Sequence, residues 1–234
     1  MKTFVRVMVA IAAAAAIAAH VVLAQEHKMT TYQLVILKRG PNAAGVATPE
    51  GQKTVQAHVQ HLYKNGADGT FKVAGPFEDD SGIAGVIVVA APTPEKALEI
   101  ESADPAVKAG FFTMEAMSFM APEGWFPGKW AEFGQFEHVY FGFLNSGPNR
   151  GQDEATANRL QQEHLAYMDA QAKEGKLVAA GPFVAAGERR GLVVYRVPTL
   201  EEAQQRGNGD PMIKAGRLAV ELHPWQVPVG ALPK

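Results

Sequence analysis

The chain contains no cysteine among its 234 residues. This absence excludes disulfide bonds, a thiolate nucleophile and cysteine-ligated zinc. An excess of charge of one sign is also lacking, since 22 lysines and arginines face 24 aspartates and glutamates without a basic run. Such a composition does not favour a nucleic-acid-binding surface. Hydrophobic residues make up 47% of the chain, which is enough for a buried core and excludes wholesale disorder.

The sequence has one long hydrophobic run, at its N-terminus. Lys2 and Arg6 precede an apolar stretch at 7–23, and the sequence becomes polar directly after Ala24. This order is typical of a secretory signal peptide, so we expect residues 1–24 to be removed by cleavage after Ala24. An uncleaved anchor is the alternative, but about 17 residues are short for a membrane span. The mature protein is therefore expected to be periplasmic or secreted, and not to be membrane-bound.

The remainder of the chain is an internal repeat. Landmarks of the first copy recur 106 residues later: His58 as His164, Gly75-Pro76-Phe77 as Gly181-Pro182-Phe183, Asp104-Pro105 as Asp210-Pro211, and Lys108-Ala109-Gly110 as Lys214-Ala215-Gly216. A period of this length indicates two domain-sized copies rather than a solenoid.

Hydrophobic periodicity and turn residues predict the order β-α-β-β-α-β within each copy. In the first copy we expect strands at 32–37, 71–74, 85–91 and 111–119, with helices at 54–65 and from Thr93 onward. In the second copy we expect strands at 138–144, 177–180, 192–197 and 217–222, with helices at 153–173 and 200–206. This order is typical of the ferredoxin-like unit, a four-stranded antiparallel sheet with two helices on one face.

A single unit would leave the other face of its sheet bare, and two units in one chain can cover each other. The expected fold class is therefore α+β, with tandem ferredoxin-like domains forming an intramolecular dimeric α/β barrel. We predict domains at 30–120 and 137–225, an aromatic linker at 121–136 and a C-terminal tail at 226–234. The linker is expected to pack against the body of the protein, and it could also roof a cavity. Oligomerisation beyond this pseudo-dimer stays open.

The candidate chemistry centres on one histidine at the same helical position of each copy, His58 and His164. In the first copy Asp79 follows the Gly-Pro-Phe segment, where its carboxylate could orient the imidazole of His58 and make it a general base. The same segment has the composition of a solvated hairpin turn, and the sequence leaves both interpretations open. The second copy has Ala185 in place of Asp79, so only the first copy is expected to hold the pair.

Other candidate sites receive less support from the sequence. His58 and His61, with Asp79, could bind zinc, but this spacing on a helix is common by chance and Tyr167 replaces the second histidine in the other copy. We therefore expect no metal and no cofactor, and the sequence contains no nucleotide-binding or hydrolase motif. The Asp-Pro pair at 104–105 and its repeat are expected to shape turns rather than to take part in chemistry.

The helix histidine, the segment Ala-Gly-Pro-Phe-Glu-Asp at 74–79 and the segment Asp-Pro-Ala-Val-Lys-Ala-Gly at 104–110 resemble the YCII-related family. The resemblance covers 32–120 and 138–224. It implies a dimeric α/β barrel with a His–Asp pair as its active site, which here would be His58 and Asp79. The second copy keeps His164, but without the acid its site is expected to be altered or silent. Related members resemble muconolactone isomerases and dehydrochlorinases.

The sequence is therefore consistent with two functions. The first is an exported small-molecule isomerase or lyase, in which His58 acts as general acid or base and Asp79 orients it, on an apolar, carbonyl- or lactone-like substrate. The alternative is a non-catalytic module, either a small-ligand-binding or a structural α/β barrel. The sequence does not identify the substrate or the reaction.

Overall fold

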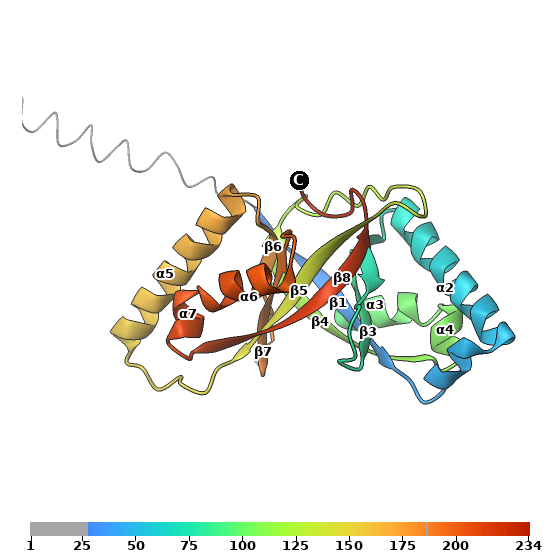
Figure 1. The fold of residues 1–234 in the computed structure, drawn as a ribbon, viewed down its shortest axis with the longest axis horizontal. Helices are drawn as coiled ribbons and strands as arrows, with labels where there is room; N and C mark the ends of the chain where they lie inside the picture. The colour runs from blue at the N-terminus through green and yellow to red at the C-terminus, as the bar shows by residue number, and fades with distance from the viewer. Residues whose placement is uncertain (1–27, 186) are drawn as a thin grey trace, which may run out of the picture.

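The computed structural model describes residues 28–185 and 187–234, and the predicted signal peptide lies outside them. Two similar halves meet at the centre of the molecule, where the strands of both cross, and the helices lie at the two ends (Figure 1). Within the described residues, no helix is long and apolar enough to cross a membrane.

Each half repeats the same sequence of elements. The first contains β1 (Met29–Arg39), the 3-10 helix η1 (Ala43–Ala47), α2 (Pro49–Ala67), β2 (Phe71–Pro76), β3 (Ile83–Val89), α3 (Pro94–Glu101), α4 (Pro105–Lys108) and β4 (Phe112–Pro122). The second contains β5 (Phe136–Ser146), α5 (Glu154–Lys173), β6 (Leu177–Pro182), β7 (Arg189–Tyr195), α6 (Leu200–Asn208), α7 (Pro211–Lys214) and β8 (Leu218–Pro228). The one-turn helices α4 and α7 were not predicted, because they are too short to show a periodicity.

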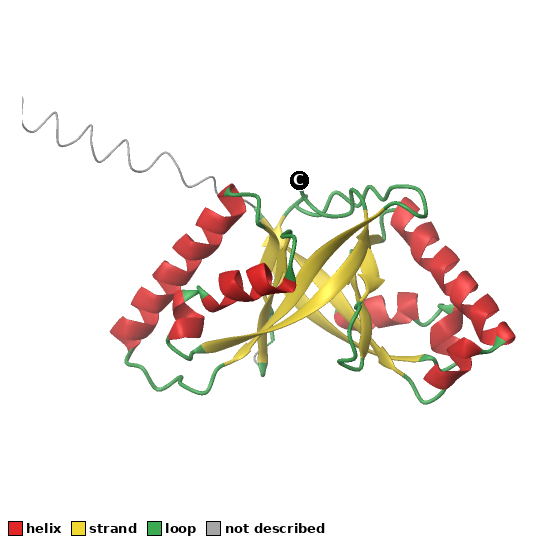
Figure 2. Ribbon diagram, in the orientation of Figure 1, coloured by secondary structure: helices red, strands yellow, loops and turns green. Residues whose placement is uncertain are grey.

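Both sheets are antiparallel and have equivalent strand orders, β2-β3-β1-β4 and β6-β7-β5-β8. The helices cover the outer face of each sheet, and the inner faces turn toward each other (Figure 2). The largest core cluster contains side chains of both halves, among them Leu34, Phe119, Phe141 and Trp225. This arrangement confirms the predicted fold, tandem ferredoxin-like units that close into one α/β barrel.

The two sheets join at both edges of the barrel. β2 lies against β8, where the indole N–H of Trp225 donates to the carbonyl oxygen of Gly75 at 2.9 Å. β4 lies against β6 at the other edge. A side chain at Gly75 would overlap the carbonyl oxygen of Gln226, and one at Gly181 would overlap that of Met120. The repeated Gly-Pro-Phe segment therefore carries glycine where one half approaches the backbone of the other.

The segment that joins the halves packs against them through its aromatic side chains. Phe126 is buried in the barrel core, with its ring centroid 5.2 Å from that of Tyr32. Farther along, the indole N–H of Trp130 donates to the carbonyl oxygen of Lys72 at 2.9 Å. This segment is thus part of the wall of the first domain.

Candidate functional site

His58 lies on α2, whose start is fixed locally. The hydroxyl of Thr48 accepts a hydrogen bond from the backbone N–H of Gly51, and Pro49 occupies the first helical position. His58 faces the body of the domain, and its Nδ1 lies 2.5 Å from Oδ2 of Asp104. The partner of His58 is therefore Asp104.

Asp104 is held in place by its role as a helix cap. Its Oδ1 accepts a hydrogen bond from the backbone N–H of Ala106 at 2.6 Å, at the start of α4, while Oδ2 faces His58. The residue is fully buried. Burial alone would raise the pKa of Asp104, but the hydrogen bond and charge of His58, together with the Ala106 N–H, hold that pKa below its ordinary value.

This geometry fixes the tautomer of the imidazole. An ionised carboxylate can only accept, so the proton of neutral His58 sits on Nδ1 and donates to Asp104. Nε2 then carries the lone pair, and within the described residues no hydrogen bond to Nε2 is found. Because the side chain of His58 lines a cavity, this arrangement can take up a proton from a bound molecule and return it.

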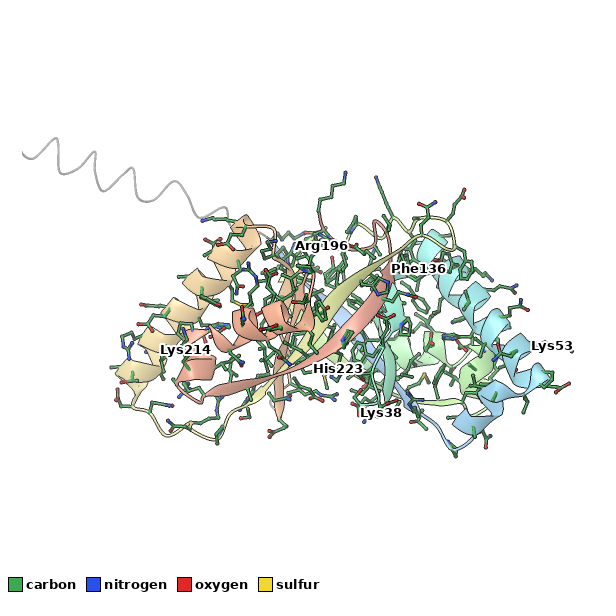
Figure 3. All side chains as sticks on the ribbon, in the orientation of Figure 1. Lys38, Lys53, Phe136, Arg196, Lys214 and His223 are labelled. Carbon is green, nitrogen blue, oxygen red and sulfur yellow. The ribbon has the colours of Figure 1, made fainter. Side chains whose placement is uncertain are left out.

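The expected pairing of His58 with Asp79 is wrong. Asp79 contacts His223 of the other domain, with Oδ2 2.7 Å from Nδ1, and its Oδ1 accepts from the Ser81 N–H in the hairpin turn. The cause is the closure of the barrel, since the N–H of Glu78 donates to a β8 carbonyl oxygen and draws this hairpin toward β8. Figure 3 shows His223 on β8, near the centre of the molecule.

His61 has a different acidic partner from that of His58. Its Nε2 lies 3.3 Å from Oε2 of the fully buried Glu101, and this hydrogen bond raises the pKa of His61. Ligand atoms of His58, Glu101 and Asp104 lie within 4.8 Å of one another, so these three, rather than Asp79, are the described residues that could surround a cation. Asp104 is already engaged by His58 and by the α4 backbone.

The second domain contains the same pair. His164 Nδ1 lies 2.5 Å from Asp210 Oδ2, and Oδ1 of Asp210 accepts from the Met212 N–H at 2.8 Å. The expectation of an altered second pair rested on Ala185, which stands in the hairpin and not beside His164. Both halves therefore retain an imidazole oriented by a buried carboxylate. Tyr167, the counterpart of His61, donates its hydroxyl proton to the carbonyl oxygen of Arg206.

Each histidine lines a cavity between the long helix and the sheet. The cavity at His58 has a volume of about 440 Å³. Its wall is mainly apolar and aromatic, and includes Leu62, Phe112, Trp130, Phe133 and Phe136. Figure 3 labels Phe136, close to the end of α2. The linker thus supplies part of this wall, in agreement with the possibility that it roofs a cavity.

The cavity at His164 has a similar volume, about 430 Å³, but a different character. Its wall contains three arginines, Arg150, Arg190 and Arg217. These arginines were not among the predicted site residues, and the two aspartate partners of the histidines were expected only to shape turns. The signal for the aspartates was present in the sequence, since the segment Asp-Pro-x-x-Lys-Ala-Gly occurs once in each copy.

The sequence profile of the YCII-related domain matches residues 31–119 and 143–226. No protein with a curated function matches the chain. Among solved structures, a mutant chlorite dismutase from Candidatus Nitrospira defluvii is similar at a TM-score of 0.54 and 12% identity, over 86% of this chain and 92% of that one. A heme-binding protein from Thermus thermophilus is similar at 0.53 and 9% identity, over 86% and 94%. At these identities the likeness concerns the fold alone.

Proposed function

Since the chain belongs to the YCII-related domain family, we propose that it is an enzyme that transfers protons on a small organic molecule bound at His58. One observation carries this proposal. The imidazole of His58 is oriented by the buried Asp104 and lines a cavity large enough for a small ligand. The apolar, aromatic wall suits an uncharged substrate of carbonyl or lactone type.

In the proposed reaction, Nε2 of His58 removes a proton from a carbon next to the carbonyl group. The resulting imidazolium keeps its Nδ1–H on Asp104, whose negative charge stabilises it. Return of the proton at another carbon gives an isomerase, and loss of a leaving group gives a lyase. Asp104 is thus a positioning residue, and His58 is the group that touches the substrate.

The alternative is a ligand-binding or structural barrel without chemistry. It is favoured by the same contacts, because Asp104 joins α2 to the start of α4 whether or not a ligand is present. In that case His58 would stabilise the fold, and the cavity would only bind.

The two functions differ in the response to His58→Asn. The asparagine amide can still donate to Asp104 from the position of Nδ1, but it has no counterpart of Nε2. We therefore expect the variant to fold while losing about 10²–10⁴ in rate of proton transfer. The assay follows, by NMR in D₂O, deuterium uptake and double-bond migration in an unsaturated γ-lactone, with His164→Asn as the matched variant. An equal rate in wild type and His58→Asn, or no exchange above buffer, would leave only the binding function.

We also propose that the protein acts outside the cytoplasm after cleavage behind Ala24. The support is the order of the N-terminal segment, in which Lys2 and Arg6 precede an apolar stretch at 7–23 and polar residues follow Ala24. Mass spectrometry of the protein from expressing cells should give an N-terminus at Gln25. Recovery of the chain with Met1 intact would contradict export by cleavage.

A further inference from the structure

The arginines at the His164 cavity differ from the other arginines of the described chain. Arg150, Arg190 and Arg217 line this one cavity, and none has a carboxylate of a described residue within 4.0 Å. The remaining described arginines all have such a partner: Arg39, Arg159, Arg189, Arg196 and Arg206. The described arginines without a carboxylate partner thus all line one cavity.

Hydrogen bonds hold Arg150 and Arg217 together without neutralising either guanidinium group. Arg150 donates from Nη1 to the carbonyl oxygen of Arg217 at 2.8 Å, and Arg217 donates from Nη1 to Oε1 of Gln152 at 2.7 Å. The Nε atoms of Arg190 and Arg217 are buried and have no hydrogen-bond partner among the described residues. Partial loss of hydration, followed by the charges of Arg190 and Arg217, lowers the pKa of Arg150, although this side chain remains largely exposed.

No acidic residue lines this cavity in the described part of the chain, and the carboxylate paired with His164 does not neutralise the arginines. Asp210 is buried, with Oδ2 on His164 and Oδ1 on the N–H of Met212. Clustered guanidinium groups with unsatisfied N–H donors are unfavourable alone, and become favourable when an anion accepts from them.

The first domain provides an internal comparison, because its backbone makes the same hydrogen bonds. The N–H of Phe77 donates to the carbonyl oxygen of Ala84, and that of Phe183 donates to the carbonyl oxygen of Arg190. Ala84 is therefore the counterpart of Arg190. Likewise, the N–H of Gly40 donates to the carbonyl oxygen of Phe111, and that of Gly147 donates to the carbonyl oxygen of Arg217. Phe111 is therefore the counterpart of Arg217.

The counterpart of Arg150 is Ala43. The N–H of Asn42 donates to the carbonyl oxygen of Gly110 as that of Asn149 donates to Gly216, so the residues that follow the two asparagines are equivalent. The fold thus accepts alanine, alanine and phenylalanine where the second domain has three arginines. The arginines are therefore not required to build the unit, and they give its cavity a separate binding property.

The geometry points to a binding site for a small organic carboxylate in the cavity at His164, with the carboxylate held by Arg150, Arg190 and Arg217. The planar guanidinium group matches a carboxylate in a bidentate fashion. Apart from Gln161 and His164, the rest of the wall is apolar and includes Leu165, Met168 and Leu192. Such a wall suits a hydrocarbon or aromatic body. This site takes a different ligand class from the His58 cavity, and binding there requires no proton transfer at His58.

The test uses the chain from Gln25 onward in low-chloride buffer, with benzoate and hexanoate as probes and benzamide and hexanamide as their neutral counterparts. We expect at least one carboxylate to bind by calorimetry and to shift the Nε–H NMR signals of Arg190 and Arg217, while its amide does neither. Binding of neither carboxylate, or equal binding of acid and amide, would overturn the proposal. Binding of inorganic phosphate but of neither carboxylate would also overturn it, by assigning the site to another anion.

Arg190→Ala introduces the residue that the first domain has at this position, and should weaken carboxylate binding about tenfold or more. Arg159→Ala removes the same charge from the exposed side of α5 and should leave binding unchanged. Unchanged affinity in Arg190→Ala would refute the assignment. If Arg190→Ala fails to fold, Arg150→Ala at an exposed position replaces it, and unchanged carboxylate affinity in that variant would likewise refute the assignment. Because binding is read directly, failure of the proposed catalysis at His58 leaves this result interpretable.

Discussion

Replacement of Asp104 tests whether this buried carboxylate organises the first site. Asp104→Ala removes the acceptor of three hydrogen bonds, one from Nδ1 of His58 and two from the backbone N–H groups of Ala106 and Val107. A hydrogen bond to a charged group contributes about 1.5–3 kcal/mol, and loss of an N-cap costs about 0.5–2 kcal/mol. Asp104→Ala should therefore lower the free energy of unfolding by about 3–4 kcal/mol, within the range for a broken buried pair.

Asp104→Asn separates the cap from the charge. Its carbonyl oxygen can still accept from Ala106, but its NH₂ group now faces Nδ1 of His58. The imidazole must present a lone pair there, so its proton moves to Nε2, with an expected stability loss of about 1.5–3 kcal/mol. Such a ring can no longer accept a proton at Nε2, and the proposed activity should fall with it.

Urea unfolding would give the stability changes, and long-range ¹H–¹⁵N NMR would give the tautomer of His58. Asp80→Ala, at a fully exposed position on the hairpin, is the control and should remain near wild type. The reasoning is refuted if Asp104→Ala costs no more than this control. It is also refuted if Asp104→Asn keeps the proton on Nδ1.

Three further outcomes are expected. Gly75→Ala should destabilise the barrel beyond the roughly 0.5–3 kcal/mol of an ordinary substitution, because its methyl group meets the carbonyl oxygen of Gln226, while Gly151→Ala in open space should be tolerated in the same urea titration. The hydrogen bond from His61 to Glu101 raises the pKa of His61 in the folded protein. The contribution of this bond to the free energy of unfolding should therefore be complete below pH 6.5 and be lost as the pH rises through the folded-state pKa. A wild-type advantage over His61→Gln that grows with pH would contradict this sign. Light scattering of the mature chain should give the mass of one chain, because each sheet already covers the other, and a dimer mass would require a further interface.

The position of the helix histidines followed from the sequence, but the identity of their acidic partners did not. Asp79 comes soon after His58 along the chain, yet it is drawn to His223 by closure of the barrel. Asp104 is 46 residues away, and only the packing of α4 against α2 brings it to Nδ1. The Asp-Pro pair was expected to shape a turn, and no local pattern predicted that a carboxylate oxygen of Asp104 would lie at Nδ1 of His58.

What the sequence determined by itself was the repeat, the order of elements and the fold class. These depend on local patterns, namely apolar runs, a helix cap such as Thr93, and turns that contain glycine. Only the tertiary structure decided which charges share a cavity. Arg150, Arg190 and Arg217 belong to three separate segments, and they meet because β7 and β8 both pair with β5. Such a site depends on strand register and domain closure, which no single stretch of sequence specifies.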